Sequence, residues 1–124
     1  MKNFSEEKQL KTALVVDDET NLCFLLKNLL TRMNYQVSCT STLAEAVKEY
    51  NQYKPDIIFL DIHLPDGLGY TLLEQLRNRD EDTYVVMMSS ETQFNNLQKE
   101  LLKRADRFLK KPFRLKEVIE IVSN

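Results

Sequence analysis

The sequence predicts an α/β protein in which five parallel strands form a sheet with helices on both faces. Short apolar runs alternate five times with segments whose apolar residues recur at three- and four-residue steps. Turn-forming residues bound the runs, as in Pro65-Asp66-Gly67. Strands separated by helical segments pair in parallel through right-handed crossovers, which place helices on both faces of the sheet.

The first half of the chain contains two strand–helix units. The first strand is predicted over residues 13–17, and the helix after it buries one face formed by Leu22, Leu25, Leu26, Leu29 and Met33. The second strand runs over residues 35–40. Thr42 and Glu45 fit a capping box that opens the second helix, whose inward face is formed by Leu43, Val47 and Tyr50.

The second half contains three further units. Strands are predicted over residues 56–61, 84–89 and 107–110. The third helix buries Leu72, Leu73 and Leu76, and the fourth is indicated by Phe94, Leu97 and Leu101. The last helix repeats apolar residues at Leu115, Val118, Ile119 and Val122.

Length and composition indicate one domain. We expect a polar lead-in over residues 1–11 and a folded domain over residues 12–124. The net charge of −2 gives no drive toward nucleic acid, and no apolar run approaches the ~20 residues of a membrane span. Without a signal peptide, and with only Cys23 and Cys39, the chain is expected in the reducing cytoplasm. We expect both cysteines to be small buried thiols, and a Cys23–Cys39 disulfide is the alternative.

Polar residues follow all five predicted strands. Parallel strands bring their carboxyl ends to one edge of the sheet, where such folds bind ligands. Three clustered carboxylates repel one another, and a divalent cation with oxygen ligands relieves that repulsion. The sequence therefore predicts a Mg²⁺ and phosphate site built from the strand ends, namely Asp17-Asp18, Thr40-Ser41, Asp61, Ser89-Ser90 and Lys110-Lys111-Pro112.

In this order the motifs resemble those of the receiver domain of bacterial two-component response regulators, over residues 13 to about 122. The features that carry the resemblance are the acidic pair Asp17-Asp18, Asp61 with its following loop, Ser89, Phe108 and Lys111-Pro112-Phe113. The resemblance implies a flavodoxin-like sheet of order 2-1-3-4-5, as in the chemotaxis member of the family. It also implies a cis peptide bond before Pro112.

The resemblance assigns a role to each acid. Asp61 is expected to be the phosphorylated residue. Mg²⁺ is the expected cofactor, with Mn²⁺ as an alternative. Its ligands would be Asp18, Asp61 and the backbone carbonyl of His63, while Asp17 would act through water. Capping of the first helix is an alternative or additional role for the acidic pair.

Other residues are expected to sense the phosphate. Ser89 and Lys111 would contact it, and Phe108 would act as an aromatic switch. The neighbouring Ser90 and Lys110 are alternatives for the first two roles. His63 and Glu91 correspond to positions that tune the lifetime of the acyl phosphate, and the two side chains are expected to form a pair over the phosphate.

The resemblance implies a phosphoacceptor switch in a two-component phosphorelay, with a histidine kinase or phosphotransfer protein as donor. Output would pass through the fourth helix, fifth strand and fifth helix to a protein partner or to a missing C-terminal output domain. No enzyme activity is expected beyond Mg²⁺-dependent self-phosphorylation and self-dephosphorylation. No direct nucleic acid or membrane binding is expected.

Two alternatives are a degenerate receiver that binds partners without phosphorylation and an aspartate-nucleophile phosphatase. The phosphatase needs a second acid where His63 stands. One departure from the family pattern is Arg104, which occupies a position where glycine usually ends the fourth helix.

Overall fold

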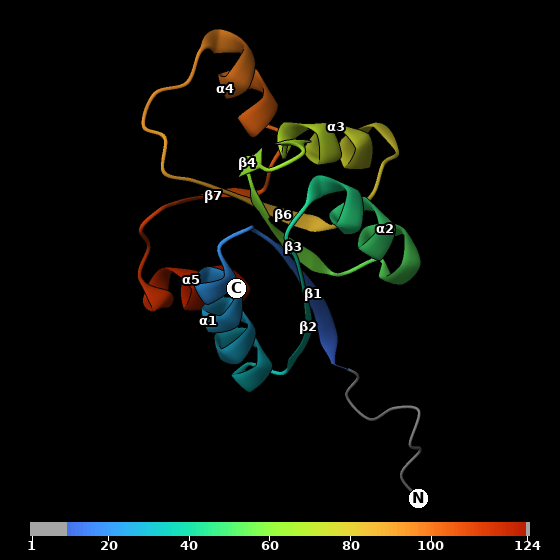
Figure 1. Cartoon of the computed structure of the whole chain (residues 1–124), viewed down its shortest axis with the longest axis vertical. Coiled ribbons are helices and arrows are strands. Elements are labelled where there is room, and N and C mark those ends of the chain that lie inside the picture. Colours follow the sequence, from blue (N-terminus) through green and yellow to red (C-terminus); the bar gives the residue numbers. More distant parts are fainter. Residues whose placement is uncertain (1–9, 124) are drawn as a thin grey trace, which may run out of the picture.

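The computed structural model of the protein describes residues 10–123. A parallel five-stranded sheet in the order β2-β1-β3-β6-β7 forms its centre (Figure 1). The strands are β1 (Lys11–Val16), β2 (Tyr35–Thr40), β3 (Ile57–Asp61), β6 (Tyr84–Ser89) and β7 (Arg107–Lys110). The predicted α/β class and the expected order of the five sheet strands are therefore confirmed.

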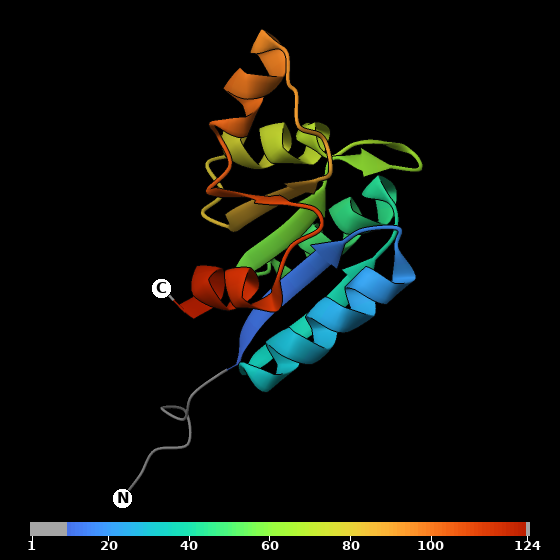
Figure 2. The same ribbon diagram turned by 90° about the vertical axis from the view of Figure 1, so that its left-hand side faces the viewer.

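Helices cover both faces of the sheet (Figures 1 and 2). They are α1 (Thr20–Arg32), α2 (Leu43–Tyr53), α3 (Tyr70–Asn78), α4 (Asn96–Leu102) and α5 (Leu115–Ser123). One apolar cluster packs α1 and α5 against the sheet, and a second packs α2 and α3 against the other face. The sheet is thus buried on both sides, which explains why β3 is continuously apolar up to Asp61.

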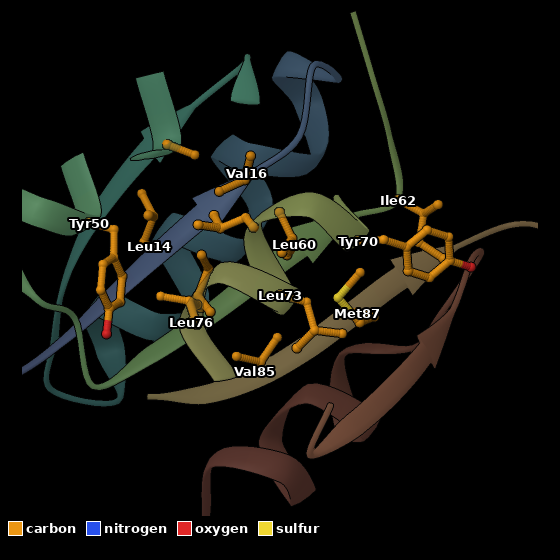
Figure 3. Packing of buried hydrophobic residues seen from close by; sticks show 13 residues of the cluster. Leu14, Val16, Tyr50, Leu60, Ile62, Tyr70, Leu73, Leu76, Val85 and Met87 are labelled. Atoms are coloured by element: carbon orange, nitrogen blue, oxygen red, sulfur yellow. The ribbon is translucent and has the colours of Figure 1, made fainter. Parts of the chain in front are cut away.

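The second cluster forms a closed layer of aliphatic side chains between two tyrosines (Figure 3). Tyr50 and Tyr70 lie at opposite ends of the labelled layer. The Tyr50 hydroxyl contacts Thr83 Oγ1 at 2.5 Å and donates to Glu81 at 3.2 Å. Such bonds compensate the cost of burying a polar atom. Within residues 10–123 the buried Tyr70 hydroxyl has no hydrogen-bond partner.

Several element boundaries differ from the sequence prediction. Strand β1 begins at Lys11, two residues before the predicted start and inside the predicted lead-in. Residues 1–9 of that lead-in lie outside the described part of the chain. A short antiparallel hairpin, β4 (His63–Leu64) and β5 (Gly67–Leu68), fills the loop after β3. Helix α4 begins after Phe94, because Asn95 and Gln98 form a capping box there.

Some of the apolar residues that indicated the helices are not buried. Leu25, Leu97 and Ile119 are 44%, 69% and 39% exposed. The predicted capping box of α2 is half-formed: Thr42 accepts from the Glu45 N–H, but the Glu45 carboxylate accepts from the N–H of Ser41 instead. Within residues 10–123 no helix is long and apolar enough to cross a membrane.

Arg104 does not adopt the left-handed conformation that glycine favours, since the positive-φ residues in the described chain are Asn34, Lys54, Asp80 and Gly67. The guanidinium of Arg77 fixes this turn instead. It donates to the carbonyl of Arg104 at 2.8 Å, to the carboxylate of Asp106 at 2.8 Å, and to the carbonyls of Glu81 and Thr83. One side chain on α3 thereby holds the connections on both sides of β6.

Replacing Arg77 with Met should destabilise the protein by about 2–4 kcal/mol, because the substitution leaves several carbonyls and the Asp106 carboxylate without their donor. Urea unfolding measures this free energy. The control is Arg79→Met, an exposed position just after the end of α3. This substitution should change the free energy of unfolding by less than about 0.5 kcal/mol. Equal effects of the two substitutions would contradict the role given to Arg77.

Candidate functional site

Two carboxylates lie side by side at the carboxyl edge of the sheet. Val16 on β1 pairs with Leu60 on β3, so the next residues, Asp17 and Asp61, are neighbours. Both are buried, with 1% and 6% of their surface exposed. The sheet register therefore forces two acids together in a poorly solvated position.

One ammonium group sits between these acids. The Nζ atom of Lys111, in the segment between β7 and α5, lies 2.6 Å from Asp17 Oδ2, 3.3 Å from Asp61 Oδ2 and 3.2 Å from Glu19 Oε1. The contact with Asp17 is the shortest of the three ion pairs. Lys110 is exposed, which leaves Lys111 as the lysine at this site. The peptide bond before Pro112 is cis, as expected.

The charges at this site do not balance. Burial and the neighbouring Asp17 raise the pKa of Asp61, although Lys111 opposes the shift. Burial disfavours the charged form of Lys111, but the two carboxylates outweigh it and raise its pKa. A single ammonium thus faces Asp17, Glu19 and Asp61, and the site retains negative charge.

A divalent cation fits this arrangement. Asp17, Asp18 and Asp61 each offer one carboxylate oxygen, and these three oxygens lie within 4.8 Å of one another. Asp18 is exposed, so its carboxylate can reach a partly hydrated ion. Clustered oxygen donors with excess negative charge suit Mg²⁺, which keeps several of its waters.

The loop after β3 is held in place at both ends. A Cβ atom at Gly69 would lie 2.3 Å from the Asp61 carbonyl oxygen, so only glycine allows the chain to pass there. The Asp66 carboxylate accepts from the N–H groups of Leu43 and Ala44 at the start of α2, at 2.7 and 3.0 Å. These bonds lower the pKa of Asp66. His63 lies between Asp61 and Asp66 in the sequence, and its backbone N–H donates to Asp61 Oδ1 at 3.4 Å.

Hydroxyl, histidine and acid side chains surround the two buried carboxylates. Ser89, at the end of β6, is buried and accepts from the N–H of Glu91 at 3.0 Å, while Ser90 is exposed. The Glu91 carboxylate lies 2.6 Å from Nε2 of His63, so the expected pairing of these side chains is present. Their contact bridges the loops after β3 and β6.

An open cavity of about 490 Å³ lies over these groups. It combines polar and apolar walls, formed by Asp18, Glu19, Leu22, Leu25, Asp61, His63, Ser89, Ser90, Lys111, Pro112 and Phe113. Phe108 does not line it. Its ring is 39% exposed and meets Phe94 edge-on, with the ring centroids 5.6 Å apart.

The structure brings the predicted Asp17, Asp18, Asp61 and Lys111 together, with Ser89, His63 and Glu91 around them. It also adds two residues that the sequence analysis did not single out. Glu19 is a further carboxylate for Lys111, and its place directly after the acidic pair was a usable signal. Asp66 was visible only as part of a turn, because its helix partner is distant in sequence.

Comparison with known proteins agrees with this geometry. The family model described as the response regulator receiver domain matches residues 13–123. The chain is 33% identical over 108 residues to the chemotaxis protein CheY of Listeria monocytogenes, covering 86% of this chain and 91% of that protein. It is 31% identical over 109 residues to the DNA-binding transcriptional regulator NtrC of a Bradyrhizobium species, covering 88% of this chain but 23% of that protein.

A solved structure gives the same result. The signal receiver domain of a putative LuxO repressor protein from Vibrio parahaemolyticus superposes with a TM-score of 0.82 at 27% identity, covering 92% of this chain and 88% of that one. Similar modules therefore occur both as nearly whole proteins and as parts of longer ones.

Replacing Asp61 with Asn should stabilise the metal-free protein at neutral pH. A carboxyl group whose pKa is raised by folding binds protons more tightly in the folded state, so its ionisation lowers stability as pH rises above its unfolded pKa. Asn removes that charge. In urea unfolding with a chelator present, the Asp61→Asn midpoint should exceed that of the parent at pH 7, and the difference should shrink as pH falls toward about 4.

The exposed Asp82→Asn variant is the matched control and should leave the midpoint nearly unchanged. Adding Mg²⁺ should stabilise the parent more than Asp61→Asn, since the ion relieves the same repulsion. A lower midpoint for Asp61→Asn in chelator would mean that the attraction to Lys111 exceeds the repulsion from Asp17.

Proposed function

The chain belongs to the response regulator receiver domain family, and we propose that it is a switch that accepts a phosphoryl group on Asp61. The observation that carries this proposal is the buried Asp61 carboxylate beside Asp17 and Lys111, at the base of an open cavity. A poorly solvated carboxylate that still faces a cavity is suited to nucleophilic attack. A histidine kinase or phosphotransfer protein is the proposed donor.

In the proposed reaction, a carboxylate oxygen of Asp61 attacks the phosphorus of a phosphohistidine. The new O–P bond forms as the N–P bond breaks, and the electron pair leaves on the imidazole nitrogen of the donor. Lys111, 3.3 Å from Asp61 Oδ2, is positioned to stabilise charge on the transferring oxygens. The product is an acyl phosphate on this chain.

We assign the proposed Mg²⁺ ligands as Asp18, Asp61 and the backbone carbonyl of His63, with Asp17 acting through water. The contact between Asp17 and Lys111 supports the indirect role of Asp17, since its Oδ2 already faces an ammonium group. Bound Mg²⁺, or Mn²⁺ in its place, would supply positive charge to the phosphoryl oxygens.

The proposed switch couples the phosphate to Ser89 and Phe108. The Ser89 hydroxyl now accepts from the N–H of Glu91, and its own proton remains available to donate to a phosphoryl oxygen. Such a bond would pull on the segment between β6 and α4, which contains Phe94, the ring partner of Phe108. A two-state change of this aromatic pair would carry the signal to the surface.

The proposed output surface is the α4–β7–α5 face, whose three elements follow one another along one edge of the molecule (Figure 2). Several large apolar side chains are exposed there, namely Leu97, Phe108, Leu115 and Ile119. Exposed basic side chains accompany them at Arg107, Lys110, Arg114 and Lys116. Apolar and charged groups together suit a protein partner, either a separate chain or an attached output domain.

Incubation with a small phosphodonor and Mg²⁺ should add one phosphoryl group, detected by intact mass. Chelation should abolish the gain, because the carboxylates alone repel an anionic donor. At limiting Mg²⁺, Asp18→Ala should reduce phosphorylation by more than Asp17→Ala, since Asp18 is proposed as the direct ligand.

The exposed Asp82→Ala variant should label like the parent protein. Full labelling in excess chelator would overturn the metal requirement, and equal loss from the two acidic substitutions would overturn the ligand assignment. No gain with several donors would favour a binding module that acts without phosphorylation.

The pair of His63 and Glu91 should control the lifetime of the acyl phosphate. Their 2.6 Å contact joins the loops after β3 and β6, and both loops line the cavity, through His63 and Ser90. Replacing both with Ala should speed dephosphorylation several-fold, because water gains access to the phosphorus. The decay of the phosphorylated mass after donor removal measures this rate, and Thr92→Ala, an exposed change on the same loop, is the control.

Slower loss in the double variant would mean that one of these side chains positions the attacking water. An unchanged rate would restrict His63 to its backbone role.

A further inference from the structure

Cys23 and Cys39 lie on the same side of the sheet, although 16 residues separate them. Cys39 on β2 pairs in register with Val15 on β1, and the side chain of Val15 belongs to the apolar cluster under α1. Residues paired across parallel strands point to the same face. The side chain of Cys39 therefore points toward α1, where Cys23 is buried in that cluster.

The contacts of the two thiols agree with this placement. The Cys39 thiol donates to the Cys23 carbonyl at 3.6 Å, and the Cys23 thiol donates to the Asp17 carbonyl at 3.5 Å. The Cys39 sulfur thus lies against the backbone of Cys23. Both cysteines are free thiols, one buried and one exposed.

The environment favours reaction at Cys39. Cys39 is exposed whereas Cys23 is buried, so a small oxidant reaches Cys39 more readily. The neighbouring Cys23 side chain lowers the pKa of Cys39 to about 7, and the ammonium group of Lys27 on α1 acts in the same direction. A thiolate of this kind, accessible and next to a second thiol, is typical of redox-sensitive cysteines.

We propose that Cys39 and Cys23 form a redox pair, in which a hydroperoxide oxidises Cys39 and Cys23 resolves the product to an intramolecular disulfide. In the first step, the Cys39 thiolate attacks one peroxide oxygen, the O–O bond breaks, and the departing alkoxide or hydroxide takes up a proton. Cys39 becomes a sulfenic acid. In the second step, the Cys23 sulfur attacks the Cys39 sulfur and water leaves, carrying the Cys23 proton. The pair loses two electrons and the peroxide gains them.

Oxidation would remove one hydrogen bond next to the acidic site. The Cys23 thiol loses its proton in the disulfide and no longer donates to the Asp17 carbonyl. The disulfide would also link α1 covalently to β2, an edge strand of the sheet. The proposal itself concerns the sulfur chemistry and does not depend on phosphorylation of Asp61.

The test uses the full reduced chain and hydrogen peroxide as the probe. Intact mass should show the loss of two hydrogen atoms in the monomer, restored by dithiothreitol, and peptide mapping without reductant should recover a Cys23–Cys39 link. The folded chain should react several-fold faster than the same chain unfolded in urea, because an ordinary thiol is only a few per cent ionised at neutral pH.

Two variants separate the roles. Cys23→Ser should stop at the sulfenic acid, trapped by dimedone on Cys39, and Cys39→Ser should react no faster than the unfolded chain. Disulfides between chains only, trapping on Cys23, or equal rates in the folded and unfolded chain would each overturn the proposal.

Discussion

The burial of two carboxylates beside a single ammonium group is the interaction on which the rest of the site depends. Asp17 and Asp61 lie at the ends of neighbouring parallel strands, and in the described residues 10–123 Lys111 is the cation that contacts both. The surrounding sheet holds the two carboxylates together, although like charges repel strongly where solvent exposure is low. This arrangement leaves a site that favours a divalent cation and an incoming phosphoryl group.

The backbone around this charge cluster has little freedom. Gly69 passes so close to the Asp61 carbonyl that no side chain fits. Asp66 fastens the same loop to the start of α2, and Arg77 fastens the turn before β7 to α3. By contrast, α4 has no buried residue and packs at the margin of the second cluster. The rigid part of the molecule thus holds the acids, while the less tightly packed part adjoins Phe108.

Strand periodicity was enough to predict the sheet, because β3 and β6 are buried on both faces and leave unambiguous apolar runs. The same logic placed Asp17, Asp61 and Ser89 at one edge. Helix faces were predicted less well. Leu25 borders the cavity and Leu97 lies on a short helix at the margin, so both are apolar without being core residues. The contacts of Asp66 and Arg77 join segments distant in sequence, and local patterns carry no signal for them.

The most direct test is to find which atom carries the phosphoryl group. An acyl phosphate on a carboxylate is reduced by borohydride to an alcohol, which converts a phosphorylated Asp into homoserine. After incubation with a phosphodonor and Mg²⁺, reduction and peptide mass analysis should find homoserine at Asp61, with no homoserine at Asp17 or Asp18 and no 5-hydroxynorvaline at Glu19. A reduced side chain at Asp17, Asp18 or Glu19, or a phosphoryl group that borohydride leaves in place, would contradict the account.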